Sequence, residues 1–307
     1  SRLVLWRNAL HLAGERFWTG WGLGEFDYAH YATLYPGERF CLIADNAHNL
    51  FLHVAVELGV PAAVALAIGL STVVWQAKPW RERRTDRLLC WGVLALVGVH
   101  SLVEYPLWYG PFQLAVALCV VHLLRTRGGA AQPVSPLGEG WDVGPREEVL
   151  PARDGPLPGP SPKREGMGRR RKLRAVAISA LATCLAWVAW DYVRIAQLYL
   201  APDKRLAAYR VQPLAHARES VLFRQQVDFA EFTTTPLNAG NAARLAVIGE
   251  RALHYSPEPR VIEKLIDALR LAGDESRAQW HRQRFEAAFP QAHASWLLRQ
   301  RSQAVSN

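Results

Sequence analysis

The sequence predicts an all-α, polytopic membrane protein with about four transmembrane helices, followed by a helical domain with a tetratricopeptide-like pattern. Residues 88–124 contain one formally charged side chain, Glu104, and residues 58–77 contain none. Arginine and proline are concentrated in a middle segment and in the C-terminal third, where apolar residues recur at helical spacing. The overall composition, 50% hydrophobic and 21% charged, therefore averages a membrane part and a polar part. Disordered, collagen-like and small disulfide-rich proteins are excluded.

Residues 1–57 form the first predicted domain, made of loops and helices outside the membrane. They contain the motif Asp-Asn-Ala-His-Asn at residues 45–49. Asp45 or Asn46 can act as the N-cap of a helix, because short polar side chains accept hydrogen bonds from the first free backbone N–H groups. The motif therefore predicts a helix that begins near Ala47.

Polar side chains gather on one face of this predicted helix. Asn49, His53 and Glu57 fall at positions i, i+4 and i+8. His48 and Asn49 lie in the first turn, where the backbone N–H groups and the helix dipole favour an anion such as a phosphate. The helix then enters the bilayer, where ionisable groups are costly and are candidates for function. The alternative is that His48 is a satisfied structural residue.

Arg16 and Arg39 lie on either side of a glycine-rich turn at residues 20–24. An arginine binds a diphosphate through two parallel hydrogen bonds, so each is a candidate for that role. The alternative for each is a solvated surface arginine. The turn is not a dinucleotide-binding fingerprint, because no strand precedes it and its spacing differs.

Four apolar runs are predicted to span the membrane, which requires about 20 mostly apolar residues. The second and fourth runs are shorter, and the side chains of Arg87 and Arg174 extend them by reaching the headgroups. A buried, alanine-rich helix of a soluble domain is the alternative for the fourth run. The runs are residues 58–75, 88–103, 107–124 and 175–190, which give a three-helix domain at 58–124 and a single span at 173–192.

A second polar cluster follows the second predicted span. His100 and Glu104 share a helix face at i, i+4, and Tyr105 precedes Pro106, where a helix should end. Glu104 then lies at the same membrane level as His48. A Glu–His pair can orient an imidazole or hold a substrate hydroxyl. The alternative is a pair that only seals the ends of the helices.

The distribution of lysine and arginine predicts the orientation in the membrane. The loop at 78–87 has five Lys or Arg residues and the loop at 125–174 has eleven, whereas residues 1–55 have four. The positive-inside rule assigns both loops to the cytoplasm. The turn at 104–110, the N-terminal domain and the chain after Asp191 then face the other side.

The segment 125–172 is predicted to be a disordered cytoplasmic loop. It has eight prolines and nine glycines among 48 residues, a composition that cannot bury a core. A net charge of +9 often indicates nucleic-acid binding, but here the topology accounts for much of it, so we expect no nucleic acid as a partner. The four cysteines have no metal-ligand spacing, so we expect no metal site.

Residues 193–307 are predicted to form a separate helical domain. Three apolar stripes predict three amphipathic helices, with breaks at Pro257, Gly273 and Pro290. Two helices per roughly 34 residues is the tetratricopeptide-like pattern. The domain is either a small helical unit or a platform for a partner. The stripes are Leu245, Ile248, Ala252 and Tyr255; Ile262, Leu265, Ile266 and Leu269; and Ala278, His281, Phe285 and Phe289.

Taken in order, these motifs resemble the C-terminal half of the O-antigen ligase and polymerase superfamily. The segments that carry the resemblance are ERFWTGWGLGEF, DNAHNLFLHVAVELGVP and HSLVEYPLWY. The chain looks most like the pilin-type O-oligosaccharyltransferases, which have an appended helical domain. The resemblance is strong over residues 1–125 and architectural over 175–307. We therefore expect the chain to be the C-terminal piece of a longer membrane protein.

The resemblance implies a multi-pass enzyme of the bacterial inner membrane with its active face in the periplasm. Such an enzyme transfers a glycan from an undecaprenyl-diphosphate carrier to a hydroxyl of a pilin-like protein, and it uses neither a metal nor a nucleotide sugar as cofactor. The histidine of the family's periplasmic loop matches His48, which is expected to be the general base. The expected substrate-binding residues are Asn46, Asn49, Arg16, Arg39, His100, Glu104 and Tyr105.

Two other functions remain open. In an O-antigen ligase or polymerase the acceptor is a sugar, on lipid A core or on a second carrier lipid. The second open function is that of a membrane-anchored helical scaffold without catalytic activity, which would also lie among membrane lipids. A simple anchor requires only apolar residues, so the polar clusters around His48 and Glu104 argue against the scaffold.

Overall fold

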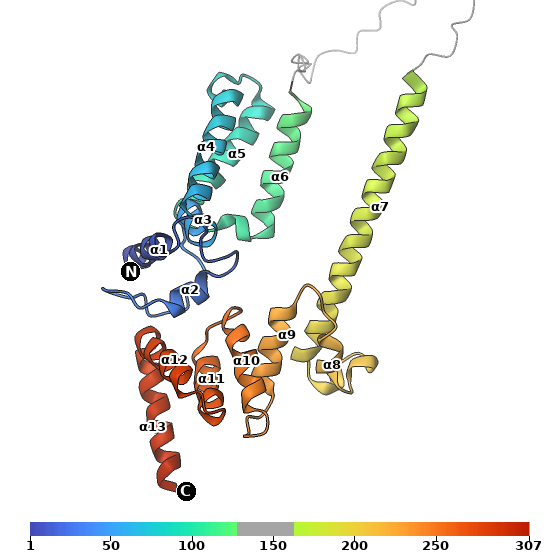
Figure 1. The fold of residues 1–307 in the computed structure, drawn as a ribbon. Coiled ribbons are helices and arrows are strands. Elements are labelled where there is room, and N and C mark those ends of the chain that lie inside the picture. Colours follow the sequence, from blue (N-terminus) through green and yellow to red (C-terminus); the bar gives the residue numbers. More distant parts are fainter. Residues whose placement is uncertain (128–162, 307) are drawn as a thin grey trace, which may run out of the picture.

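The computed structural model describes residues 1–127 and 163–306, and all the regular structure in this described part is helical. Most of the predicted loop 125–172 lies outside these residues. Figure 1 shows α6 packed beside α5, a long separate α7, and a row of helices that leads from α9 to the C-terminus. The main helices are α1 Arg2–Glu15, α2 Phe26–Ala32, α3 Leu50–Leu58, α4 Val60–Ala77, α5 Thr85–His100, α6 Gly110–Arg125, α7 Lys163–Ala196, α8 Pro213–Ala217, α9 Arg224–Thr234, α10 Ala242–Leu253, α11 Pro259–Leu271, α12 Glu275–Ala288 and α13 Pro290–Ser306.

Two of the four predicted spans are supported by helices of sufficient length. The candidate spans are Val60–Arg81, which includes α4, and Ala175–Tyr199, which includes most of α7. Their apolar side chains are largely exposed, as expected for helices that face lipid. Helices α5 and α6 are apolar but have only 16 residues each, so the second and third spans remain predictions.

Helix α7 corrects one predicted boundary. We expected the loop to continue to residue 172, but the helix begins at Lys163 and continues to Ala196. The sequence from 163 to 174 is rich in lysine and arginine, and straight-chain residues of this kind favour helix. The span therefore continues a helix that starts about ten residues earlier.

The C-terminal domain confirms the three predicted helices, which are α10, α11 and α12. From α9 to α13, each helix packs against the next, around a core that includes Phe232, Leu265 and Phe285. Tyr255 lies beyond the end of α10 rather than on it. A further helix, α13, was not predicted. It begins at Pro290, which is possible because proline is well tolerated in the first turn of a helix. The tetratricopeptide-like assignment remains a prediction.

Helix α2 connects the N-terminal domain to the C-terminal domain. The Tyr31 side chain is almost fully buried in the core of the C-terminal domain, and its hydroxyl lies 2.9 Å from Nδ1 of His281. Next to it, Arg284 donates a hydrogen bond to the carbonyl of Ala32 at 2.7 Å. These contacts hold α2 against α12.

The buried carboxyl of Asp27 on α2 should make stability depend on pH. Burial raises the pKa of Asp27 to about 7, and the nearby carboxylates of Glu25 and Asp45 contribute to the rise. A carboxyl whose pKa is raised by folding stabilises the protein below the unfolded pKa, and this stabilisation is lost as the pH rises toward 7. Asp27→Asn should therefore be more stable than wild type at pH 8, by roughly 1–3 kcal/mol, and no more stable at pH 4.

Thermal unfolding of the two proteins at pH 4 and pH 8 measures this difference. Asparagine keeps the side-chain oxygen that accepts the hydrogen bond from the N–H of Tyr28. An equal difference in unfolding temperature at both pH values would contradict the assignment.

Candidate active site

Three segments that are distant in sequence meet at the candidate site: the start of α1, the loop before α3, and the loop between α5 and α6. The N–H of Leu50 donates to the carbonyl of Ser101 at 2.8 Å. The side-chain amide of Asn49 donates to the carbonyl of Leu102 at 2.9 Å. These two bonds hold the motif at residues 45–49 against the loop that contains Glu104.

The motif does not begin the helix where we expected. Helix α3 begins at Leu50, and its N-cap is Asn49, whose side chain accepts from the N–H of Leu52 at 3.0 Å. A helix start near Ala47 with Asp45 or Asn46 as cap is therefore wrong. Two backbone N–H groups of the first turn are already used, because Leu50 donates to the carbonyl of Ser101 and Leu52 to the side chain of Asn49. Anion binding at this helix end remains a prediction.

His48 lies just before the helix, in a left-handed conformation with a φ of 51°. The side-chain oxygen of Asn46 accepts the N–H of His48 at 2.7 Å, a local turn in which asparagine commonly takes part. Asn46 is buried, whereas the His48 side chain is about one-third exposed. Asn46 thus positions His48, and its role in substrate binding remains a prediction.

His48 pairs with Glu104, as the sequence had placed them at one level. The Nδ1 of His48 lies 2.8 Å from Oε2 of Glu104, and Oε1 of Glu104 accepts from Arg2 at 2.6 Å. The hydrogen bond from His48, followed by the charges of His48 and Arg2, holds the pKa of Glu104 below its usual value. An ionised Glu104 favours a proton on Nδ1 of His48, which leaves Nε2 free to accept one.

His100 does not take part in this pair. We expected it to face Glu104 at i, i+4. Helix α5 ends at His100, and the backbone N–H of Glu104 still donates to the carbonyl of His100 at 2.8 Å, but the side chain of Glu104 pairs with His48 and Arg2. The His100 ring instead meets Phe112 edge-to-face, with the ring centres 5.9 Å apart. Tyr105 lies where it was expected, with its ring in edge-to-face contact with His48 at 4.8 Å.

The two candidate arginines are engaged elsewhere. The guanidinium of Arg39 donates to the carbonyls of His30 and Thr33, and burial lowers its pKa. The guanidinium of Arg16 lies over the ring of Trp21, 4.1 Å from its centre. Both contacts stabilise the loops of the N-terminal domain. Within residues 1–127 and 163–306 neither arginine contacts His48 or Glu104, and their role in diphosphate binding remains a prediction.

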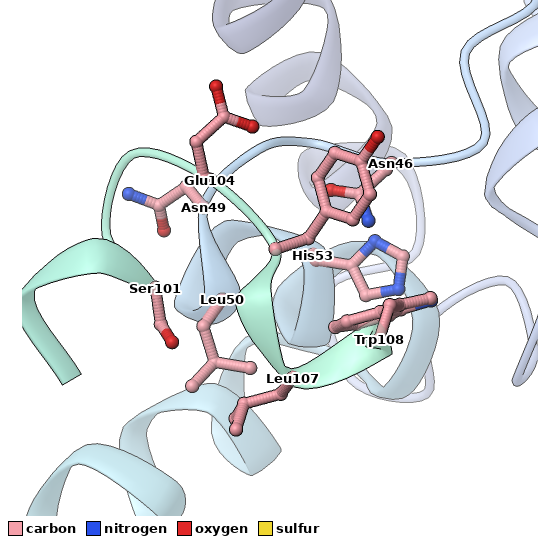
Figure 2. A pocket seen from close by; sticks show the side chains of 9 residues that line it. Asn46, Asn49, Leu50, His53, Ser101, Glu104, Leu107 and Trp108 are labelled. Atoms are coloured by element: carbon pink, nitrogen blue, oxygen red, sulfur yellow. The ribbon is translucent and has the colours of Figure 1, made fainter. Parts of the chain in front are cut away.

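Next to the pair lies a small hollow that sequence reasoning only partly identified. Figure 2 shows that its lining side chains come from the loop before α3, from the start of α3, and from the end of α5 and the loop that follows it. His53 and Trp108 line it although neither was proposed for substrate binding, and Arg2 was missed because no spacing rule connects residues 2 and 104. The lining residues are Asn46, Asn49, Leu50, His53, Ser101, Glu104, Tyr105, Leu107 and Trp108.

The site has the groups for acid–base chemistry on a hydroxyl. A histidine oriented by a carboxylate is a common general base, and Arg2 adds a positive charge that is half exposed. In the described ranges 1–127 and 163–306, no cluster of three or more His, Cys, Asp or Glu side chains could hold a metal ion. The contact between Nδ1 of His48 and Glu104 favours proton transfer by His48.

Comparisons with known proteins agree with the resemblance. The O-antigen ligase family matches residues 1–67, and the C-terminal region of virulence-factor membrane-bound polymerases matches residues 88–142 and 156–303. The general O-oligosaccharyltransferase of Acinetobacter baylyi is 25% identical over 154 residues, or 47% of this chain. The match spans only 26% of that protein's length. No solved structure matches the chain.

Proposed function

The chain belongs to the O-antigen ligase superfamily, and from this premise we propose that it carries the catalytic face of a membrane glycosyltransferase. The donor is a glycan on a polyprenyl-diphosphate carrier, and the acceptor is a hydroxyl, by preference that of a serine or threonine in a protein. The observation that carries the proposal is the 2.8 Å contact between Nδ1 of His48 and Glu104, beside Arg2. The match to an O-oligosaccharyltransferase supports the protein acceptor.

The proposed mechanism is a direct displacement. Nε2 of His48 takes the proton of the acceptor hydroxyl, and the acceptor oxygen attacks the anomeric carbon of the glycan. The bond from that carbon to the diphosphate oxygen breaks, and the diphosphate leaves with the bonding electrons. Attack from the side opposite the diphosphate inverts the anomeric configuration. Glu104 stabilises the imidazolium, and the exposed charge of Arg2 faces the same region.

A second candidate is an O-antigen ligase or polymerase, in which the acceptor hydroxyl belongs to a sugar on lipid A core or on a growing polysaccharide. The family matches over residues 1–67 and over the C-terminal region support it. The chemistry at His48 is the same for both candidates. The acceptor alone separates them.

Mass spectrometry of periplasmic proteins tests the proposal. We expect glycan-bearing serine or threonine peptides in cells with the full-length gene, and none in cells that lack it or carry His48→Ala. If instead the cells that lack the gene, or carry His48→Ala, lose the glycan from lipid A core, the result would favour the ligase. If neither proteins nor lipids change, the proposed transferase function is wrong.

The proposed topology makes a separate prediction. The lysine and arginine counts assign residues 78–87 and 125–172 to the cytoplasm, and residues 1–55 and 195–307 to the periplasm. Alkaline phosphatase, which is active only outside the cytoplasm, should be inactive when fused after residue 150 and active when fused after residue 230. The reverse pattern would put His48 on the wrong side for a periplasmic reaction.

A further inference from the structure

His53 is a buried histidine that the mechanism above does not use. Its side chain is 7% exposed, and its Nε2 lies 3.4 Å from Oε2 of Glu57, one helical turn further along α3. The other oxygen of Glu57 accepts the backbone N–H of Gly24 at 3.0 Å. The nearest acceptor for a ring proton is thus Glu57, which favours the proton on Nε2 of His53.

The second ring nitrogen of His53 has no such neighbour. Nδ1 is buried and has no hydrogen-bond partner among the described residues. Buried polar atoms without a partner are rare in folded proteins, and each requires an explanation. With the proton on Nε2, Nδ1 is a hydrogen-bond acceptor.

Neighbouring rings fix the direction of this acceptor. Phe26 stacks on the imidazole at 5.4 Å with an angle of 15°, and Trp108 meets it edge-to-face at 5.0 Å. These two rings restrict the rotation of the imidazole. Figure 2 shows it among the side chains that line the hollow, with Asn46 and Trp108 beside it. The same hollow includes Glu104, the partner of His48.

We propose that His53 binds a substrate hydroxyl through Nδ1, in the hollow beside the His48–Glu104 pair. The inference rests on the proposed transferase function, because that reaction brings hydroxyl-bearing molecules to this face. The hydroxyl belongs either to the glycan of the donor or to the acceptor. The hollow is small, about 10 Å³, which is room for a single hydroxyl rather than a whole sugar ring. Trp108 is half exposed and meets the imidazole of His53 edge-to-face, so an aromatic ring lies beside the histidine that would accept the hydroxyl.

Two substitutions of His53 distinguish the binding of a hydroxyl through Nδ1 from the structural contact of Nε2 with Glu57. An asparagine amide takes the place of Nδ1, so His53→Asn keeps the group in the hollow and loses the contact with Glu57. A glutamine amide takes the place of Nε2, so His53→Gln keeps that contact and loses the group in the hollow. Both are tested in the full-length protein in membrane vesicles, with extracted polyprenyl-diphosphate-linked glycan as donor and the acceptor identified by the mass-spectrometry experiment.

We expect His53→Gln to raise the KM of one substrate about tenfold, with the unfolding temperature unchanged, and His53→Asn to have a KM near that of wild type. A higher KM for the donor assigns the hydroxyl to the glycan, and a higher KM for the acceptor assigns it to the acceptor. The inference is overturned if the two variants have equal KM values. It is also overturned if both lose more than about a hundredfold in kcat, because such a loss indicates a general base. Absence of transfer by the wild-type protein would instead refute the proposed function.

Discussion

Replacing His48 by alanine should lower glycan transfer by the full-length protein by about 10²–10⁴-fold, the usual contribution of a general base. The reason is the contact between Nδ1 and Glu104 at 2.8 Å, which leaves Nε2 of His48 to accept the proton of the acceptor hydroxyl in the proposed mechanism. Carrier-linked glycan should accumulate, while the amount of protein in the membrane stays normal. Transfer is measured with purified donor, and protein by immunoblot.

His100→Ala is the matched control for this experiment. His100 lies on the helix that leads to Glu104, but its ring contacts Phe112 and not the pair. We therefore expect nearly normal transfer by His100→Ala. Nearly normal transfer by His48→Ala together with lost transfer by His100→Ala would show that the base is the other histidine.

The membrane helices and the C-terminal helices could be predicted because their signals are local. A charge-free run such as residues 58–77 can satisfy its backbone in lipid only as a helix, and α4 occupies that run. The stripe that begins at Ile262 identified α11 in the same way. Helix α13 was missed because Pro290 is equally compatible with a helix end and a helix start, and the local sequence does not decide between them.

The sequence identified some residues of the candidate site, but not the contacts between them. The motif at 45–49 singled out His48, but both asparagines and Asp45 are good caps, so the sequence could not show that Asn49 is the one used. Helical spacing paired Glu104 with His100 on the assumption that α5 continues. The partners of Glu104 instead come from residues 2 and 48, and only the tertiary structure brings these together.

Replacing Tyr31 by alanine should release helix α2 from the C-terminal domain. Tyr31 is 1% exposed and lies in the core of that domain, so we expect a loss of about 3–5 kcal/mol in the free energy that holds the two together, as for other large-to-small core substitutions. Tyr31→Phe removes only the hydroxyl that meets His281 and should cost about 1–3 kcal/mol. Limited proteolysis and thermal unfolding of the full-length protein measure both effects.

Tyr31→Ala should also lower glycan transfer, because α2 reaches the candidate site. Phe26, at the other end of α2, stacks on His53 in the hollow. If α2 moves, this ring contact is lost, and His53 and the loop before α3 lose a support. Leu298→Ala, on an exposed face of the same C-terminal domain, removes a similar apolar side chain and should leave both stability and transfer unchanged. If the Tyr31→Ala protein is cleaved no faster than wild type and transfers glycan at the same rate, the C-terminal domain does not hold α2 in place.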